Sequence, residues 1–237
     1  MKRTKINNFK FYDLVKNPNI SNKLIYQDLL SIKYATVLVI GASRSGKTEL
    51  IRNILYHVVI PWESKLFILA PTVFDDKSYG RLIKRMKGIN EMVLSPDLED
   101  SFFIKLKEER NKENSDLGAE NIVLFDDISD VLKNAKQINY LATKNRHQKT
   151  FMIVSTQNYV DTNTKLRRQA THLILFGGLM EQDLELIYSN FIKSNFHIDL
   201  EKFYSLYRNE TKEKYQYILI DTLKKKIRSG MTEELDI

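Results

Sequence analysis

Short, uniformly apolar runs alternate with longer amphipathic stretches along most of this chain. Runs of this kind are typical of buried strands, whereas apolar residues spaced three or four positions apart are typical of helices. The runs predict strands over 35–40, 65–70, 91–94, 121–126, 149–155, 171–176 and 214–221. The stretches between them predict helices over 47–58, 78–87, 97–113, 129–144, 181–193 and 199–207.

This alternation predicts an α/β domain with a mainly parallel sheet and helices on both faces, because strands that are buried on both sides are apolar throughout. The last run, 214–221, alternates more between apolar and polar residues, which fits an antiparallel strand at the C-terminal edge. We assign residues 35–223 to this domain and 1–34 to an N-terminal arm with a short helix over 23–30. Residues 224–237 then form a basic and finally acidic tail, and we expect 108–120 to be an exposed loop.

Composition excludes several classes of protein. A chain of 237 residues that is 43% hydrophobic can bury a large core, so it is not globally disordered. No apolar run approaches the roughly 18 residues of a membrane helix, and no apolar stretch follows the basic N-terminus. We therefore expect neither a membrane segment nor a secretory signal. The absence of cysteine fits a reducing, intracellular compartment and excludes thiolate metal sites.

A phosphate-binding motif follows the first predicted strand. Residues 41–48 read Gly-Ala-Ser-Arg-Ser-Gly-Lys-Thr, which is the pattern G-x-x-x-x-G-K-[ST] between a buried strand and a helix. The glycines allow a tight turn that aims backbone N–H groups at phosphates, the lysine reaches the β- and γ-phosphates, and the threonine hydroxyl ligates Mg²⁺. The start of the helix adds the positive end of its dipole. The predicted site for a nucleoside triphosphate and Mg²⁺ comprises Gly41, Ala42, Ser43, Arg44, Ser45, Gly46, Lys47 and Thr48.

Two carboxylates follow another apolar strand. The run over 122–125 leads directly into Asp126 and Asp127, at the carboxyl end of a strand, where open α/β sheets place their ligands. We expect Asp126 to hold Mg²⁺ through its hydration shell, and Asp127 to orient or deprotonate an attacking water. We also expect this strand to lie next to the strand before the phosphate loop. The alternative for Asp127, or for Ser129, is a helix N-cap.

Gln157 follows a third apolar strand. If this strand lies beside the acidic one, the Gln157 amide ends next to the γ-phosphate, where it can sense the phosphate or position water. The alternative is a polar residue that merely begins a loop. Phosphoryl transfer also needs positive charge, and the candidates are Arg146, Arg167 and Arg168. Each of these arginines can equally be a solvated surface residue, and one that reaches a neighbouring subunit requires an oligomer.

The order of these motifs resembles the FtsK–HerA superfamily of DNA-pumping ATPases, and within it the poxvirus-type genome-packaging ATPases of large DNA viruses and virophages. The segment 146–159, Arg-His-Gln-Lys-Thr-Phe-Met-Ile-Val-Ser-Thr-Gln-Asn-Tyr, carries most of the resemblance. The turn at Pro71-Thr72, with Asp75, Asp76 and Tyr79 shortly after it, and the closing strand over 215–221 also fit. The resemblance covers about residues 30–225, almost the whole chain.

The resemblance implies a RecA-like core, a homo-oligomeric ring, and ATP-driven translocation of double-stranded DNA into a viral capsid, in infected cells or in the virion. It gives Lys47 and Thr48 the phosphate-loop roles, Asp126 the metal role, Asp127 the catalytic role and Gln157 the sensor role, with Arg146 as arginine finger. Two residues depart from the family pattern. Asp127 stands where glutamate is frequent, and Arg44 stands where small residues are commoner.

A net charge of +7 favours a polyanionic partner such as DNA. The candidate contacts with DNA phosphates are the stretches 84–87 and 224–228, although both can be ordinary solvated surface. Two other classes of function remain open, a small nucleotide kinase and a non-hydrolysing nucleotide-gated DNA-binding or assembly module. A helicase is closer to the motor, but the chain is short for one.

Overall fold

The structure is a computed structural model that describes residues 2–6, 30, 32, 34–58, 64–75, 79–80, 82–83, 91–97, 99–111, 120–128, 132 and 135–237. Almost all of the predicted helix over 23–30 and the basic stretch 84–87 lie outside these residues. Parts of the predicted helices over 78–87 and 129–144, and of the predicted loop over 108–120, lie outside them as well.

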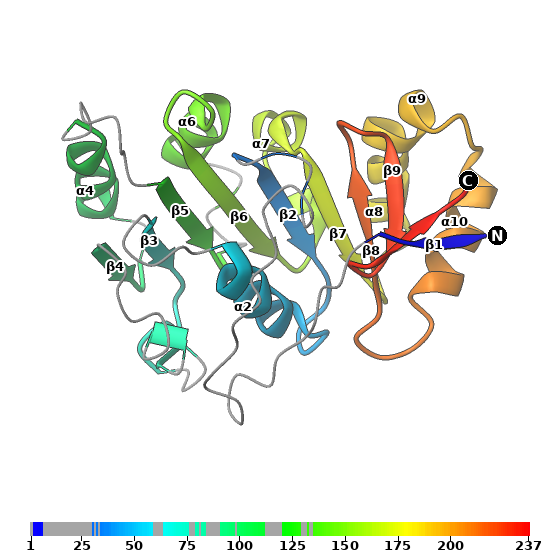
Figure 1. The fold of residues 1–237 in the computed structure, drawn as a ribbon, viewed down its shortest axis with the longest axis horizontal. Helices are drawn as coiled ribbons and strands as arrows, with labels where there is room; N and C mark the ends of the chain where they lie inside the picture. The colour runs from blue at the N-terminus through cyan, green and yellow to red at the C-terminus, as the bar shows by residue number, and fades with distance from the viewer. Residues whose placement is uncertain are drawn as a thin grey trace.

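The described residues form one sheet of ten strands (Figure 1). In chain order these are β1 (Arg3–Lys5), β2 (Thr36–Ile40), β3 (Ser64–Leu69), β4 (Glu91–Ser95), β5 (Glu120–Phe125), β6 (Thr150–Thr156), β7 (His172–Phe176), β8 (Tyr217–Asp221), β9 (Lys226–Ser229) and β10 (Glu233–Leu235). Their order across the sheet is β1-β10-β9-β8-β7-β2-β6-β5-β3-β4. Neighbours from β7 to β4 are parallel, and neighbours from β1 to β7 are antiparallel.

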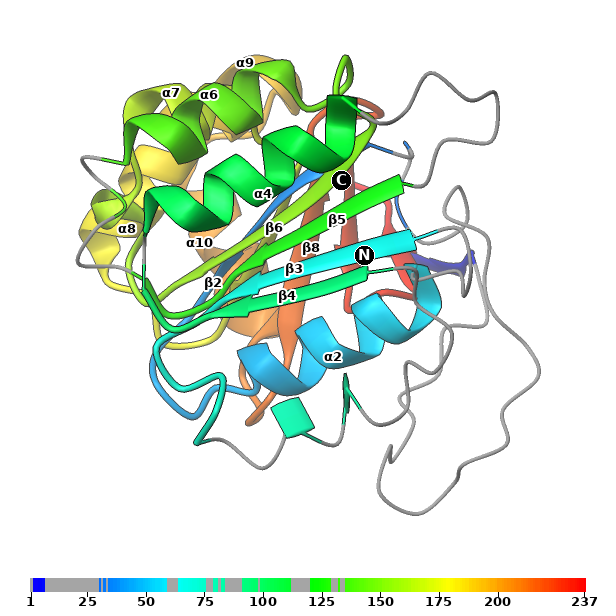
Figure 2. The same cartoon turned by 90° about the vertical axis from the view of Figure 1, so that its left-hand side faces the viewer.

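Helices cover both faces of the sheet (Figure 2). They are α2 (Lys47–Val58), α4 (Asp100–Asn111), α6 (Lys136–Lys144), the 3₁₀ turn η1 (Tyr159–Asp161), α7 (Thr164–Gln169), α8 (Glu181–Ile187), the π-helix η2 (Tyr188–Ile192), α9 (Lys193–Asn195) and α10 (Leu200–Glu210). Helix α2 lies on one face, whereas α4, α6, α7, α8 and α10 lie on the other. The predicted α/β class with a mainly parallel sheet is therefore confirmed.

The sheet separates two hydrophobic cores, which explains why its central strands are apolar throughout. Successive side chains of a strand point to opposite faces. In β2, Leu38 and Ile40 pack into the core beneath α4, α6 and α10, whereas Val37 and Val39 pack into the core beneath α2. A polar residue inside such a strand would be buried whichever way it pointed, so polar side chains are concentrated at the strand ends.

The C-terminal part of the sheet is larger than the sequence predicted. Strand β8 is antiparallel to β7, as its pattern indicated, but it is not an edge strand, because β9, β10 and β1 continue the sheet beyond it. The segment 224–237, which the sequence suggested as a tail, contains β9 and β10. These strands have four and three residues and bury single apolar side chains such as Ile227 and Leu235, too few to produce a periodic pattern.

The predicted helix over 181–193 also differs in detail. It consists of α8, the π-helix η2 and α9, and the backbone N–H of Lys193 donates to the Tyr188 carbonyl five residues earlier. The short elements η1 and α7 were not predicted, because three and six residues are too few to establish a helical period. Of the helices that the structure describes, none is both long enough and apolar enough to cross a lipid bilayer.

Candidate nucleotide-binding and catalytic site

The phosphate loop connects β2 to α2 at the carboxyl edge of the parallel strands. A Cβ added to Gly41 would lie 2.7 Å from the Cβ of Phe176 and 2.8 Å from Ser45 Oγ, so no side chain fits there. Gly46 has a φ of +101°, a conformation that residues with a side chain rarely adopt, and an added Cβ would lie 3.1 Å from Tyr215 Cδ1. Both glycines of the motif are therefore required by the geometry of the loop.

The loop is suited to bind an anion. Ser45 Oγ is buried and has no hydrogen-bond partner in the part of the chain that the structure describes. The N–H groups in the first turn of α2 have no acceptor within the helix, and they point away from it together with the positive end of its dipole. Phosphate oxygens would satisfy these donors, so the loop fits a nucleoside triphosphate. Arg44 lies at the apex of the loop with a φ of +63° and an exposed side chain.

Lys47 is held inside the loop. Its ammonium group donates to the carbonyl oxygens of Gly41 at 2.6 Å and Ala42 at 2.9 Å, and only 8% of the residue is exposed. Burial lowers the pKa of Lys47, and the nearby carboxylates of Asp126 and Asp127 partly oppose this shift. The lysine thus places a desolvated positive charge between the loop and the acidic pair, where the charge of a bound phosphate would develop.

Asp126 and Thr48 come together as the sequence predicted for a shared metal ion. Asp126 directly follows β5 and is 4% exposed, and its Oδ2 accepts a hydrogen bond from Thr48 Oγ1 at 3.4 Å. The same oxygen accepts a hydrogen bond from the hydroxyl of Tyr79, a side chain that is 1% exposed. The sequence indicated Tyr79 only through the family resemblance, because nothing in the pattern around it predicts a contact with a residue 47 positions away.

One expectation about the sheet is wrong. Strands β2 and β5 are not neighbours, because β6 lies between them and pairs in parallel with both. Thr48, on the first turn of α2, nevertheless contacts Asp126. The chain order of the strands does not determine their order in the sheet, so local sequence could not reveal this insertion.

The position of β6 places Gln157 between the loop and the acidic pair. We expected Gln157 near the γ-phosphate only if its strand lies beside the acidic strand, and β6 does lie directly beside β5. Gln157 Nε2 donates to Asp127 Oδ1 at 3.3 Å. Asp127 is exposed and has a φ of +54°, a left-handed conformation that aspartate tolerates better than most residues and that recurs at functional sites.

The loop after Gln157 is anchored to helix α8 and the π-helix. Asp183, which is 1% exposed, accepts a hydrogen bond from the backbone N–H of Val160 at 2.9 Å. Burial raises the pKa of this carboxyl group. Asn190 Nδ2 donates to the hydroxyl of buried Tyr159 at 3.0 Å, and burial raises the pKa of Tyr159 to about 12. The sequence analysis missed Asp183 because its partner lies in a different element.

Arg167 belongs to this anchor and is not a free arginine. Its guanidinium donates to the carbonyl of Val160 at 2.9 Å and to Thr162 Oγ1 at 3.0 Å, and it lies 4.6 Å from the ring centroid of Tyr159. Arg167 therefore stabilises its own chain, which removes it as a candidate for an arginine finger. Arg168, the next residue, is exposed in the last turn of α7.

Arg146 is exposed in the turn before β6, at the amino end of that strand. Gln157 lies at the carboxyl end, and seven strand residues separate the two ends by about 20 Å at roughly 3.3 Å per residue. Arg146 therefore cannot reach the phosphate loop of its own chain, and a role in catalysis requires a neighbouring subunit.

An apolar cavity of about 430 Å³ adjoins the phosphate loop. It is lined by Gly46, Glu49, Leu50, Phe176, Tyr215 and Tyr217. Tyr215 is half exposed, and the rings of Phe176 and Tyr217 lie 5.0 Å apart behind it. An aromatic cavity beside a phosphate site can hold the base of a nucleotide. Sequence reasoning assigned Tyr215 only to a strand, and the strand in fact begins at Tyr217.

Comparisons with known proteins agree with this architecture. The structure is similar to the genome packaging NTPase B204 from Sulfolobus turreted icosahedral virus 2 in complex with AMPPCP, with a TM-score of 0.60 and 17% identity over 87% of this chain and 100% of that chain. For B204, the DNA-packaging ATPase from Sulfolobus turreted icosahedral virus, the TM-score is 0.61 and the identity 19%, over 86% and 98% of the two chains. For EssC (ATPases 2 and 3) from Geobacillus thermodenitrificans, the TM-score is 0.52 and the identity 13%, over 85% of this chain and 39% of that chain.

At these identities the structural matches show a shared fold. A search of curated protein sequences found no match. A comparison with protein families matched residues 21–234 to the poxvirus A32 protein. Because this match spans nearly the whole chain, the chain belongs to the poxvirus A32 protein family.

Proposed function

We propose that this chain is an ATP-hydrolysing motor that moves double-stranded DNA and packages viral DNA into a capsid. One observation carries the proposal. An ammonium, a hydroxyl, two carboxylates and an amide, from Lys47, Thr48, Asp126, Asp127 and Gln157, meet at one edge of the sheet. Membership of the poxvirus A32 family and the similarity to B204, described as a DNA-packaging ATPase, support DNA as the substrate that is moved.

The side chains divide the chemistry among them. The phosphate loop and Lys47 bind the triphosphate of ATP, and the Thr48 hydroxyl and Asp126 carboxylate would hold Mg²⁺, which neutralises charge on the phosphates. One carboxylate and one hydroxyl fit Mg²⁺, because this ion generally keeps water and phosphate oxygens as its other ligands. Asp127 orients the attacking water, and the Gln157 amide holds the Asp127 carboxylate in place.

The base of ATP occupies the aromatic cavity beside Gly46. Its wall is formed by Phe176, Tyr215 and Tyr217, which offer apolar faces for stacking, and Glu49 at its rim can accept a hydrogen bond from an exocyclic amine. The cavity lies next to the loop on the same edge of the sheet, so a single nucleotide can fill both.

The functional unit is a homo-oligomeric ring in which each site is completed by the next subunit. Arg146 supplies the positive charge for the transition state of the neighbouring site, since it cannot reach its own. Such a ring acts inside infected cells, at the site of virus assembly or on the capsid vertex through which DNA enters.

The experiment that tests the proposal measures phosphate release from Mg²⁺-ATP with and without long duplex DNA, together with the mass of the particle. We expect hydrolysis that DNA stimulates, an oligomeric mass, and loss of at least about 100-fold in rate in a Lys47→Ala variant, since one donor to a transition-state charge is worth about that much. Transfer of phosphate to a nucleotide acceptor would instead support a kinase. Tight ATP binding without turnover, even with DNA, would support a nucleotide-gated binding module.

A further inference from the structure

The amino edge of the sheet, opposite the nucleotide site, is rich in positive charge, and the role that we infer for it rests on the proposed function. Residues 131–180 contain eight lysines or arginines and one acidic residue, so their net charge of +7 equals that of the whole chain. The segment includes α6, α7 and the beginnings of β6 and β7. The beginnings of β6, β2 and β7 lie at the same edge of the sheet as the turn after β8, because these four strands are consecutive neighbours and β8 is antiparallel to β7.

Two turns at this edge carry exposed lysines. Lys144 and Lys149 flank the turn between α6 and β6, and Lys224 and Lys225 lie in the turn between β8 and β9. Within the part of the chain that the structure describes, none of the four forms an ion pair. Exposed lysines that nothing neutralises are available to an external anion.

The basic residues that follow Lys225 in the sequence are already paired or buried. Lys226 pairs with Glu234 at 2.6 Å, and Arg228 is 4% exposed. The expectation that the whole stretch 224–228 is available to DNA is therefore wrong for the buried Arg228, and Lys226 already has an acidic partner, so the turn carries the exposed lysines without one.

Buried and partly buried hydrogen bonds hold the two turns in fixed positions. Asn145 Nδ2 donates to Tyr34 O at 2.9 Å and to Thr36 Oγ1 at 3.0 Å, which ties the α6–β6 turn to the beginning of β2. The backbone N–H of Thr36 donates to Thr171 Oγ1 at 3.1 Å, and Thr222 Oγ1 donates to Thr171 O at 3.0 Å. This chain of contacts connects the beginnings of β6, β2 and β7 with the β8–β9 turn.

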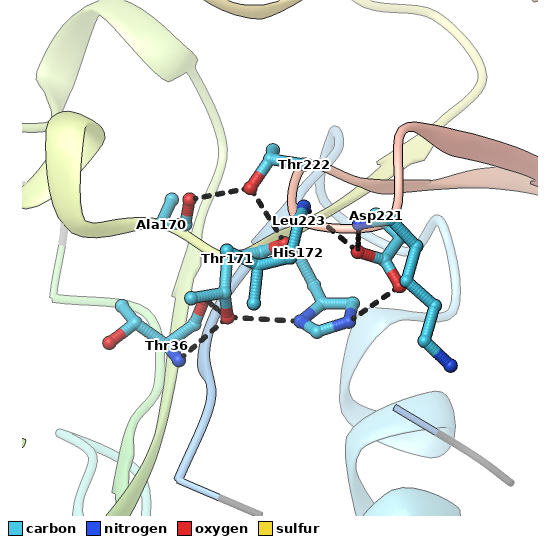
Figure 3. A network of polar contacts seen from close by, with 8 residues as sticks. Thr36, Ala170, Thr171, His172, Asp221, Thr222 and Leu223 are labelled. Carbon is cyan, nitrogen blue, oxygen red and sulfur yellow. Dashed lines mark hydrogen bonds and ion pairs between the residues drawn. The ribbon is translucent and has the colours of Figure 1, made fainter. Parts of the chain in front are cut away.

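The β8–β9 turn has a second support (Figure 3). The backbone N–H groups of Leu223 and Lys224 donate to Asp221 Oδ1 at 3.0 and 2.9 Å, and Asp221 Oδ2 lies 3.5 Å from His172 Nε2. Both Asp221 and His172 are fully buried. The backbone that carries Lys224 and Lys225 is therefore fixed by the protein interior, while their side chains remain in solvent.

We propose that this amino edge is a contact surface for the backbone of double-stranded DNA. Strands β6, β2, β7 and β8 are consecutive neighbours, so the two basic turns are about 14 Å apart at roughly 4.8 Å per strand. The major groove of DNA is about 12 Å wide, so the turns reach phosphates on its two sides. Lysines bind phosphate as point charges and read no base, which suits a motor that must move along any sequence.

The test compares two quadruple variants with the same change in net charge. The edge variant replaces Lys144, Lys149, Lys224 and Lys225 by Glu. The control variant replaces four exposed lysines outside these two turns by Glu, namely Lys105, Lys193, Lys202 and Lys212. Fluorescence anisotropy with a labelled duplex at several salt concentrations gives Kd and its salt dependence. Thermal melting, basal ATP hydrolysis and particle mass are measured on the same samples.

We expect the edge variant to bind DNA at least about 30-fold more weakly, and the slope of log Kd against log salt to fall by about three to four, since each phosphate contact contributes about 0.9. The control should bind within about threefold of the wild type and should keep basal ATP hydrolysis. Basal hydrolysis of the edge variant does not decide the test, because Arg146 lies in the same turn as Lys144 and Lys149. If the glutamates impair folding, the corresponding Lys→Gln variants serve the same comparison.

Equal DNA binding by the two variants would overturn the inference and leave the proposed function standing. An edge variant that no longer assembles, yet binds DNA like the control, would identify the edge as a subunit interface and also overturn it. A wild type that neither binds DNA nor hydrolyses ATP would overturn the proposed function itself.

Discussion

Replacing Tyr79 by Phe tests how the Asp126 carboxylate, which we propose to hold Mg²⁺, is positioned. The Tyr79 hydroxyl donates to Asp126 Oδ2, the oxygen that also accepts from Thr48. Phenylalanine keeps the ring that fills this buried position and removes only the hydroxyl, so no cavity is created. In the variant, the Asp126 carboxylate loses a donor that restricts its rotation.

The expected magnitude follows from this contact. A hydrogen bond to an ionised group contributes about 1.5–3 kcal/mol. Loss of a hydrogen-bond partner behind a metal ligand typically costs 10–100-fold in metal affinity, which corresponds to about 1.4–2.7 kcal/mol. The two ranges agree, so we expect Tyr79→Phe to need roughly 10–100 times more Mg²⁺ for half-maximal hydrolysis, while binding of ATP without metal stays unchanged.

Two measurements check this expectation. Hydrolysis is followed during a Mg²⁺ titration at fixed ATP, and Mn²⁺ affinity is measured by electron paramagnetic resonance with a non-hydrolysable ATP analogue bound. Tyr140→Phe, at an exposed position on α6, is the matched control and should leave both quantities unchanged. An unchanged or tighter metal affinity in Tyr79→Phe would mean that the hydroxyl does not support the metal-binding form of Asp126, and the reasoning would be wrong.

Three further predictions follow from the structure. Asp127→Asn should bind ATP with an affinity within about threefold of the wild type but hydrolyse it about 10²–10⁴-fold more slowly. Asparagine tolerates the φ of +54°, but its amide cannot act as a base. Loss of ATP binding would instead indicate a structural role for Asp127. Mixtures of Arg146→Ala and Lys47→Ala subunits should hydrolyse ATP faster than either variant alone, and no recovery at any mixing ratio would argue against a finger acting between subunits. Burial lowers the pKa of His172, so below about pH 6.5 the unfolded chain binds a proton that the native state does not bind. The free energy of unfolding should therefore decrease as the pH drops below about 6.5, by up to about 1.4 kcal/mol per pH unit. Urea unfolding at pH 5 and 7 should show a smaller loss in His172→Asn, and an equal loss in both proteins would refute the assignment.

The ends of the central strands could be predicted from the sequence for a physical reason. A strand buried on both faces must be apolar until it leaves the core, so the first polar residues after it mark the edge of the sheet. This places Asp126 directly after β5 and Gln157 directly after β6, as observed. The glycine motif likewise located the beginning of α2 at Lys47, because the turn before it needs glycine at Gly41 and Gly46.

Contacts between distant elements could not be predicted in this way. Tyr79 contacts Asp126, and Asp183 contacts Val160, only because separate elements pack together, and no local periodicity records such a pairing. The short strands β9 and β10 gain their stability from hydrogen bonds to β8 and β1 and not from an apolar pattern of their own. For the same reason Arg167 looked like a free arginine in the sequence.

The wrong expectation about the neighbour of β2 is also the most instructive error, because the inserted strand determines which side chain lies between the loop and the acidic pair. If β2 and β5 were paired, the strand that bears the loop and the strand that bears Asp126 would be about 4.8 Å apart. With β6 between them the separation is about 9.6 Å, and Gln157 emerges in the middle. In the proposed mechanism, the γ-phosphate and the attacking water lie in this space, between Lys47 on one side and Asp127 on the other. The insertion of β6 therefore separates the loop from the acidic pair and supplies the amide that donates to Asp127, the residue that we propose to orient the water.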